Sequence, residues 1–246
     1  MSCHMSEPRL FDAHTHPRPL PGPGGYAPSG ADLSLCSGSS PDDWEKIASL
    51  SSEDGRVLPC FGLHPWFAEK AGPGWLKKLE GFLRGRPSCV GEIGLDKAAD
   101  TGPGPQMEVF RAQLRLARGL ARPAVLHCVG AWGPLAAALR EEAPPVFMVH
   151  AYGGSPETAE ELAGLGCYFS FGADLLKAGR IKARRAIRAV PADRLLFETE
   201  GLSGGGLADV VSAAAGILGE RPEVLAGLSW NNARRFLGGL FPDVFR

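Results

Sequence analysis

The apolar positions along the chain fall into short runs separated by longer stretches of mixed polarity. Eight runs of four to seven residues, bounded by glycine, proline or polar clusters, have the length and composition of buried strands. The predicted strands are Leu10–His14, Asp32–Ser37, Val57–Leu63, Cys89–Gly94, Ala124–His127, Val146–His150, Cys167–Phe171 and Leu195–Thr199.

Segments with the 3.6-residue period of amphipathic helices lie between most of these runs. Examples are "SPDDWEKIASL", "GPGWLKKLEGFLRG", "PQMEVFRAQLRLARGL" and "SPETAEELAGLG". Strands that alternate with helices form parallel sheets, and eight repeats within 246 residues predict one closed (β/α)8 barrel of the TIM type.

Three parts of the chain depart from this repeat. Residues 1–8 are expected to be a disordered lead-in, which leaves residues 9–246 as a single barrel domain. The first crossover, "PRPLPGPGGYAPSG", holds five prolines and four glycines in 14 residues and is expected to be an irregular loop. The last quarter predicts two or three extra helices that cover the outside of the barrel.

Charge and cysteine content narrow the functional classes. The formal net charge is −1, so no overall positive field attracts nucleic acid, and a polyanionic substrate would have to be bound by local groups. The six cysteines are scattered singly, which favours buried thiols over a zinc ribbon or redox motif. With no secretory h-region and no apolar run of 18 residues or more, we expect a cytoplasmic monomer without membrane insertion.

Polar side chains recur where the predicted strands end. In "LFDAHTHP", alternation places Asp12, His14 and His16 on one face of the first strand. Functional groups of (β/α)8 barrels lie at the carboxyl ends of the strands. Those positions also hold His64, Glu92, His127, His150, Glu198 and Glu200, so that five of the six histidines are at strand ends.

Shared metal coordination explains these residues together, because buried histidines and carboxylates without partners are costly. Four imidazoles and two carboxylates are enough for two ions with one bridging carboxylate. Nitrogen and oxygen ligands admit magnesium, manganese, zinc, cobalt or nickel. Two adjacent ions favour hydrolysis of phosphoesters, amides or lactones. Asp12, Asp96 and Glu198 are expected to support the ligands.

Nine motifs, in order, resemble those of the TatD family of metal-dependent deoxyribonucleases, within the amidohydrolase superfamily. They are "DAHTHP", "GLHPW", "GEIGLD", "QMEVFRAQL", "PAVLHC", "VHAYGGS", "YFSFG", "RLLFETE" and "NNARRF". The resemblance spans about Leu10 to Leu237. It implies a barrel with two divalent ions, such as magnesium or manganese, and exonucleolytic hydrolysis of phosphodiester bonds at DNA ends, single-stranded ends being the expected substrate.

The resemblance also implies roles for individual residues. His14 and His16 would hold the first ion, Glu92 would bridge, and His127 and His150 would hold the second ion. Glu200 would ligate the first ion and position the attacking water. His64 would face the scissile phosphate; the alternative is a histidine that only caps the strand before Pro65.

Three departures from the family pattern keep other functions open. Glu200 replaces the family's aspartate, Val129 and Gly130 follow His127 where the family has a polar or basic residue, and "GLSGGGLADVV" replaces a longer loop. The alternatives are a hydrolase of a small ester, lactone or amide, and a non-catalytic descendant that binds metal. The basic segment "GRIKARRAIRAV" is either a solvated outer face or a phosphate-attracting patch.

Overall fold

The computed structural model describes residues 8–17, 30–201 and 206–245. Residues 1–7 of the expected disordered lead-in and residues 18–29 of the irregular first crossover lie outside these residues. The same holds for residues 202–205 of the glycine-rich segment after the eighth strand.

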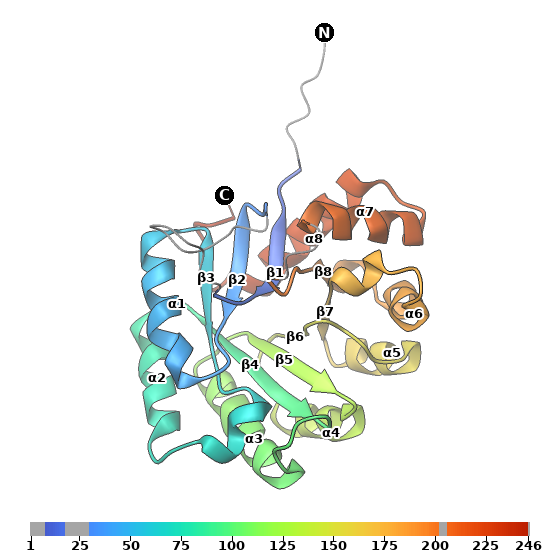
Figure 1. The fold of residues 1–246 in the computed structure, drawn as a ribbon. Coiled ribbons are helices and arrows are strands. Elements are labelled where there is room, and N and C mark those ends of the chain that lie inside the picture. Colours follow the sequence, from blue (N-terminus) through green and yellow to red (C-terminus); the bar gives the residue numbers. More distant parts are fainter. Residues whose placement is uncertain (1–7, 18–29, 202–205, 246) are drawn as a thin grey trace.

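Eight parallel strands close into a barrel, which confirms the predicted fold (Figure 1). Each strand pairs with the next, and the pair Asp12 and Phe197 joins the last strand to the first. Every predicted strand is present, with ends shifted by at most two residues. The strands are β1 (Phe11–Thr15), β2 (Leu33–Ser37), β3 (Val57–Phe61), β4 (Cys89–Asp96), β5 (Ala124–Val129), β6 (Phe147–Val149), β7 (Tyr168–Phe171) and β8 (Leu195–Phe197).

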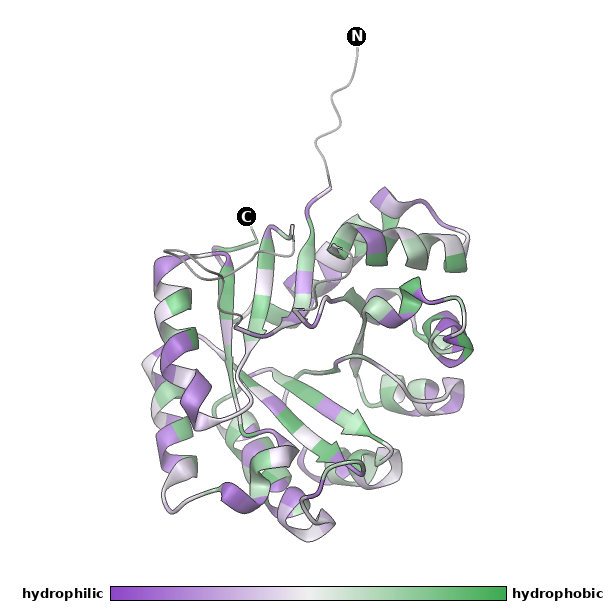
Figure 2. Cartoon of the chain, in the orientation of Figure 1, coloured by the Kyte–Doolittle hydropathy of each residue, from purple (hydrophilic) through white to green (hydrophobic). Residues whose placement is uncertain are grey.

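Helices surround the barrel, and their polar faces point away from it (Figure 2). Proline opens α1, α3, α5 and α8, where its fixed φ suits the first turn and its missing N–H is not needed. The α-helices are α1 (Pro41–Glu53), α2 (Trp75–Gly85), α3 (Pro103–Gly119), α4 (Trp132–Glu142), α5 (Pro156–Gly164), α6 (Ile181–Ala189), α7 (Leu207–Leu218) and α8 (Pro222–Leu237). Short 3₁₀ helices are η1 (Pro65–Lys70), η2 (Ala173–Leu176) and η3 (Ala192–Arg194).

Alternation along the strands divides the apolar core into two layers. On β3, Val57 and Phe61 face the helices, whereas Leu58 and Cys60 face the barrel interior. Both layers are closely packed, which gives the strand ends fixed positions. The polar residues that follow those ends therefore sit on a rigid frame.

The C-terminal helices do more than cover the outside of the barrel. Helix α7 packs against the outer layer, as expected, but the end of α8 and the residues after it join the interior cluster. Phe245 lies 6.2 Å from Phe11 and Phe236 lies 5.4 Å from Tyr168 between ring centroids. These rings close the amino-terminal end of the barrel and leave the opposite end for function.

Two glutamines of α3 hold the loops that follow β3 and β4. Gln113 accepts a hydrogen bond from the Leu63 backbone N–H at 2.7 Å and donates to its carbonyl at 3.1 Å. Gln106 accepts from the Asp96 N–H at 2.7 Å. Both side chains are buried, and their hydrogen bonds satisfy buried backbone groups where β3 and β4 lead into their loops.

The five described cysteines are free and buried, as expected from their scattered positions. Burial raises the pKa of the Cys36 and Cys128 thiols to about 12. Among the residues that the structure describes, no helix combines the length and apolar character needed to span a bilayer.

Candidate metal centre

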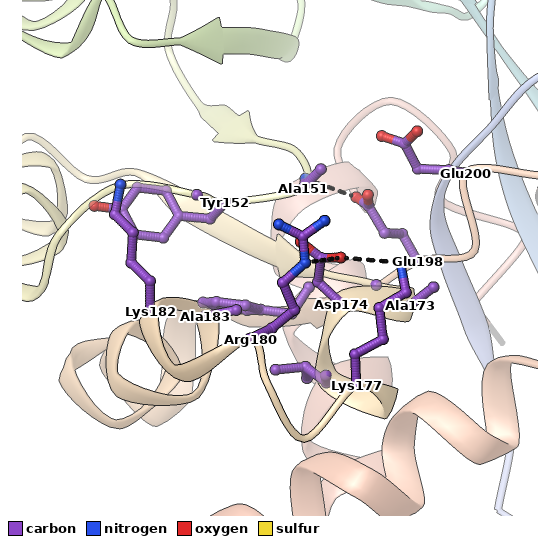
Figure 3. A pocket seen from close by; sticks show the side chains of 14 residues that line it. Ala151, Tyr152, Ala173, Asp174, Lys177, Arg180, Lys182, Ala183, Glu198 and Glu200 are labelled. Carbon is purple, nitrogen blue, oxygen red and sulfur yellow. Dashed lines mark hydrogen bonds and ion pairs between the residues drawn. The ribbon is translucent and has the colours of Figure 1, made fainter.

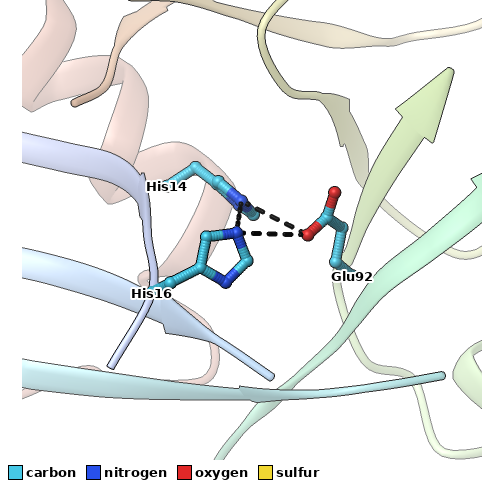
Figure 4. Close-up of side chains that lie close together, drawn as sticks. All are labelled: His14, His16 and Glu92. Atoms are coloured by element: carbon cyan, nitrogen blue, oxygen red, sulfur yellow. Dashed lines mark hydrogen bonds and ion pairs between the residues drawn. The ribbon is translucent and has the colours of Figure 1, made fainter. Parts of the chain in front are cut away.

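Glu92 lies at the centre of the histidines that the sequence analysis singled out. Its Oε2 atom is 3.5 Å from His14 Nε2 and 3.4 Å from His16 Nε2, across the barrel mouth from β1 (Figure 4). Its Oε1 atom is 2.9 Å from His127 Nδ1 and 2.7 Å from His150 Nε2. The two carboxylate oxygens thus divide the four imidazoles into two pairs.

In the first pair, His16 presents an unprotonated nitrogen to the centre. His16 Nδ1 is 2.9 Å from the Ser37 carbonyl, which can only accept, so this nitrogen carries the proton and Nε2 has the lone pair. Ser37 Oγ lies 3.2 Å from His14 Nδ1. The two Nε2 atoms face each other at 3.2 Å. One serine therefore orients both rings toward the same point.

The second pair is oriented by Asp96. Its Oδ2 atom lies 3.2 Å from His127 Nε2 and accepts from the Trp66 indole at 2.7 Å. This leaves His127 Nδ1 to face His150 Nε2 at 3.2 Å. A carboxylate behind an imidazole is the usual support of a metal-ligating histidine, because it fixes the tautomer and ring orientation.

His64 differs from the other histidines in the nitrogen that it presents. Its Nδ1 accepts a hydrogen bond from the Trp66 backbone N–H at 3.2 Å, which leaves the ring proton on Nε2. Nε2 lies 3.2 Å from Glu92 Oε1. Burial lowers the pKa of His64, so the ring is neutral at physiological pH. His64 offers the centre a proton donor where His16 and His127 offer lone pairs.

Glu200 reaches the centre from the end of β8. Its φ of +55° is unusual for a residue other than glycine, and its N–H donates to the His14 carbonyl at 3.0 Å. Its Oε1 lies 3.1 Å from His150 Nδ1. This contact lowers the pKa of Glu200 to about 2 although burial opposes ionisation. The carboxylate thus lies beside His14 and His150.

The charges at the centre are strongly coupled. Burial disfavours the Glu92 carboxylate, but His150, His127 and His14 outweigh it and hold the pKa of Glu92 well below its ordinary value. Burial likewise opposes the His150 imidazolium, but Glu92, Glu198 and Glu200 raise its pKa well above the usual range. For His14, burial and the neighbouring His150 lower the pKa.

Buried carboxylates support the centre from behind. Glu198 Oε2 accepts from the Ala151 N–H at 3.1 Å and from the Ser170 hydroxyl. Asp12 accepts from the Thr199 N–H at 3.0 Å and from its hydroxyl at 2.6 Å, which ties β1 to β8 below the ligands. Both acids lie where the sequence placed supporting groups.

The sequence analysis did not predict the supporting roles of three residues: Ser37, Trp66 and Ser170. Ser37 ends β2, so the strand-end rule that selected the histidines would also have selected it. Trp66 lies inside η1, and its role depends on the fold of a short loop. Ser170 lies within β7 and carries no distinguishing pattern.

The nitrogen and oxygen donor atoms of this arrangement are suited to divalent metal ions. The ligand atoms of His14, His16 and Glu92 lie within 4.8 Å of one another, as do those of His14, His150 and Glu200 and those of His64, Glu92 and His127. Nitrogen and carboxylate oxygen suit zinc, manganese or magnesium. His150 Nδ1 lies 3.1 Å from Glu200 Oε1 and 3.7 Å from Glu198 Oε1, so carboxylates also surround the side of this ring that faces away from Glu92.

Metal binding should stabilise the fold measurably. An ion at 100 times its dissociation constant adds about 2.7 kcal/mol, which corresponds to a rise in Tm of roughly 5–10 °C for a domain of this size. Differential scanning fluorimetry of EDTA-treated protein, before and after addition of manganese, zinc or magnesium, measures the shift. An unchanged Tm with all three ions would contradict a metal centre.

Comparisons with known proteins agree with this geometry. The family model for TatD-related DNases matches residues 11–238. The mouse protein called putative deoxyribonuclease TATDN3 is 30% identical over 173 residues, which are 64% of this chain and 58% of that protein. The 3′-5′ ssDNA/RNA exonuclease TatD of Erwinia billingiae is 29% identical over 227 residues, 82% of this chain and 85% of that protein.

A solved structure shows the same fold. The TatD homologue YjjV of Escherichia coli superimposes with a TM-score of 0.82 at 25% identity, over 94% of this chain and 98% of that one. For several curated relatives the matched segment is shorter, 58 to 63% of their length. The family model nonetheless covers nearly the whole barrel with its strand-end histidines. The chain belongs to the family of TatD-related DNases.

Proposed function

We propose that this protein is a metal-dependent hydrolase that removes nucleotides from the ends of single-stranded DNA with the help of two divalent ions. The observation that carries the proposal is the position of the Glu92 carboxylate. Its Oε2 faces His14 and His16, and its Oε1 faces His127 and His150. A carboxylate placed in this way suits a bridge between two ions. The TatD of Erwinia billingiae, named as a 3′-5′ ssDNA/RNA exonuclease, supports the substrate class.

Each ligand has a defined place in this proposal. His14, His16 and Glu92 would hold the first ion, with Glu200 beside His14, while Glu92, His127 and His150 would hold the second. Bound there, magnesium, manganese or zinc would polarise the phosphoryl group and lower the pKa of a water molecule. Ser37 and Asp96 keep the imidazole tautomers that present lone pairs to the ions.

The other polar groups act on the substrate and on water. His64 Nε2–H is aimed at the centre and would donate a hydrogen bond to a non-bridging oxygen of the scissile phosphate, stabilising charge as the bond breaks. Glu200 stays ionised because its pKa is about 2. Its carboxylate would accept a hydrogen bond from the attacking water and orient it.

A second candidate function rests on the end of β5. Val129 is 41% exposed there and Gly130 follows, so the end of β5 itself presents no basic side chain to a phosphate, and the nearby Lys97 belongs to the segment after β4. Such a site suits a small ester, lactone or amide. A third candidate, favoured by the unusual Glu200, is a descendant that binds metal without turnover. In each case we propose a cytoplasmic monomer.

End-labelled single-stranded DNA separates these candidates. Protein of measured metal content is incubated with magnesium or manganese, and mononucleotide release is followed on a gel; EDTA-treated protein is the control. Metal-dependent release supports the exonuclease. Hydrolysis confined to small esters, lactones or amides would replace it with the second candidate. Metal-loaded protein that hydrolyses none of these substrates would indicate the third.

A further inference from the structure

A pocket of about 450 Å³ opens beside the metal centre, and Glu200 lines both (Figure 3). Its floor holds Glu198 and Glu200 from the end of β8. Its outer wall is built from the segment between β7 and the first turn of α6, where Lys177, Arg180 and Lys182 gather. The pocket therefore connects the candidate reaction centre with a basic rim.

The basic side chains exceed the acid that they face on this wall. Asp174 Oδ1 lies 3.4 Å from Lys177 Nζ and 3.2 Å from Arg180 Nε. Lys182 forms no ion pair within the described part of the chain. This wall thus holds one carboxylate for three cations, and that carboxylate pairs with two of them; the other two acids of the pocket, Glu198 and Glu200, lie at its floor. The side chains of Lys177 and Arg180 are 61% and 58% exposed, so their charged ends are accessible to a ligand.

The side chains of the wall favour an anionic ligand and offer no aromatic face for a base. Tyr152 and Phe171 line the pocket, but each is only 2% exposed, so neither presents a ring face on which a base could stack. Lysine and arginine side chains at the rim suit phosphate oxygens.

We propose that Lys177, Arg180 and Lys182 form a subsite for a backbone phosphate of the substrate strand, next to the phosphate that is cleaved. This inference rests on the proposed function and adds the direction in which the strand leaves the centre, toward α6. Because the contacts are to phosphate, binding should depend on salt and little on base sequence.

The test compares a long and a short substrate. The triple variant K177Q/R180Q/K182Q and the wild type are assayed on single-stranded oligonucleotides and on bis(p-nitrophenyl) phosphate, which has no neighbouring phosphate. We expect KM for the oligonucleotide to rise about tenfold or more, with the salt slope of log KM reduced by about 2, at roughly 0.7 per lost contact. Hydrolysis of the small diester should stay within about twofold, because no phosphate contact beyond the scissile group is available to lose.

A matched control removes the same charge elsewhere. The variant K77Q/R185Q/R234Q replaces three exposed basic residues that do not line the pocket. It should behave as the wild type does on both substrates. If the wild type hydrolyses DNA but the two triple variants have equal KM values for the oligonucleotide and equal salt slopes, the subsite alone is overturned. If the metal-loaded wild type hydrolyses neither the oligonucleotide nor bis(p-nitrophenyl) phosphate, the proposed function is overturned, and the subsite with it.

Discussion

The Glu92→Gln variant is expected to lose at least about 1,000-fold in kcat/KM on whichever substrate the wild type hydrolyses, equivalent to roughly 4 kcal/mol. The amide keeps the size of the side chain but removes the negative charge that faces both imidazole pairs. It also places an NH₂ group where one of the two ligand oxygens stood, so that one of the proposed ions loses an oxygen ligand. Steady-state kinetics, with metal content determined by inductively coupled plasma mass spectrometry, measures both effects.

The matched control is Glu45→Gln on α1, an exposed site with the same chemical change. It should leave metal content and kinetics unchanged. Circular dichroism establishes whether each variant is folded. A folded Glu92→Gln protein that keeps two ions and full activity would remove Glu92 from the centre, and with it the two-ion proposal.

The strand ends and the barrel could be predicted because they depend on local pattern. Short apolar runs fixed the strands to within two residues, and the parallel order followed from the intervening helices. The strand-end rule then brought His14, Glu92 and His150 to one place, because the carboxyl ends of all strands meet at one mouth. No long-range contact had to be known in advance.

The parts that could not be predicted depend on contacts between distant segments. The ring proton of His64 is placed by the backbone of Trp66, and only the folded loop reveals that hydrogen bond. The contact between Glu200 and His150 likewise depends on the folded chain, because the positive φ of Glu200 and its bond to His14 set where the side chain begins. Neither contact can be inferred from the amino-acid composition.

The basic segment around α6 shows the same limit. Its sequence allowed either a solvated face or a phosphate-attracting patch. The structure places Lys177, Arg180 and Lys182 on the wall of the pocket beside Glu200, whereas Arg188 donates to the Ile217 carbonyl at 2.9 Å, away from that wall. Helical periodicity alone does not identify the neighbour of each face.

Gly94→Ala should be the most damaging single-methyl change in the barrel, lowering the free energy of unfolding by about 4 kcal/mol. Gly94 has a φ of +150°, and a Cβ atom there would lie 1.9 Å from the His127 carbonyl oxygen. The two residues are partners in the β4–β5 register, so the clash is with backbone and no side-chain rotation relieves it. Urea denaturation followed by circular dichroism gives the loss, which corresponds to a fall in Tm of roughly 10 °C.

Gly81→Ala is the matched control, because this exposed glycine of α2 has open space where the Cβ would stand. Helix propensity predicts a gain of up to about 1 kcal/mol there. The same methyl group therefore has opposite expected effects at the two positions. Relief of the Gly94→Ala clash must move β5, and His127 with it, away from Glu92. The Gly94→Ala variant should thus lose metal affinity even where it remains folded. If its stability and metal content equal those of the wild type, the close approach of β4 and β5 does not hold His127 in place.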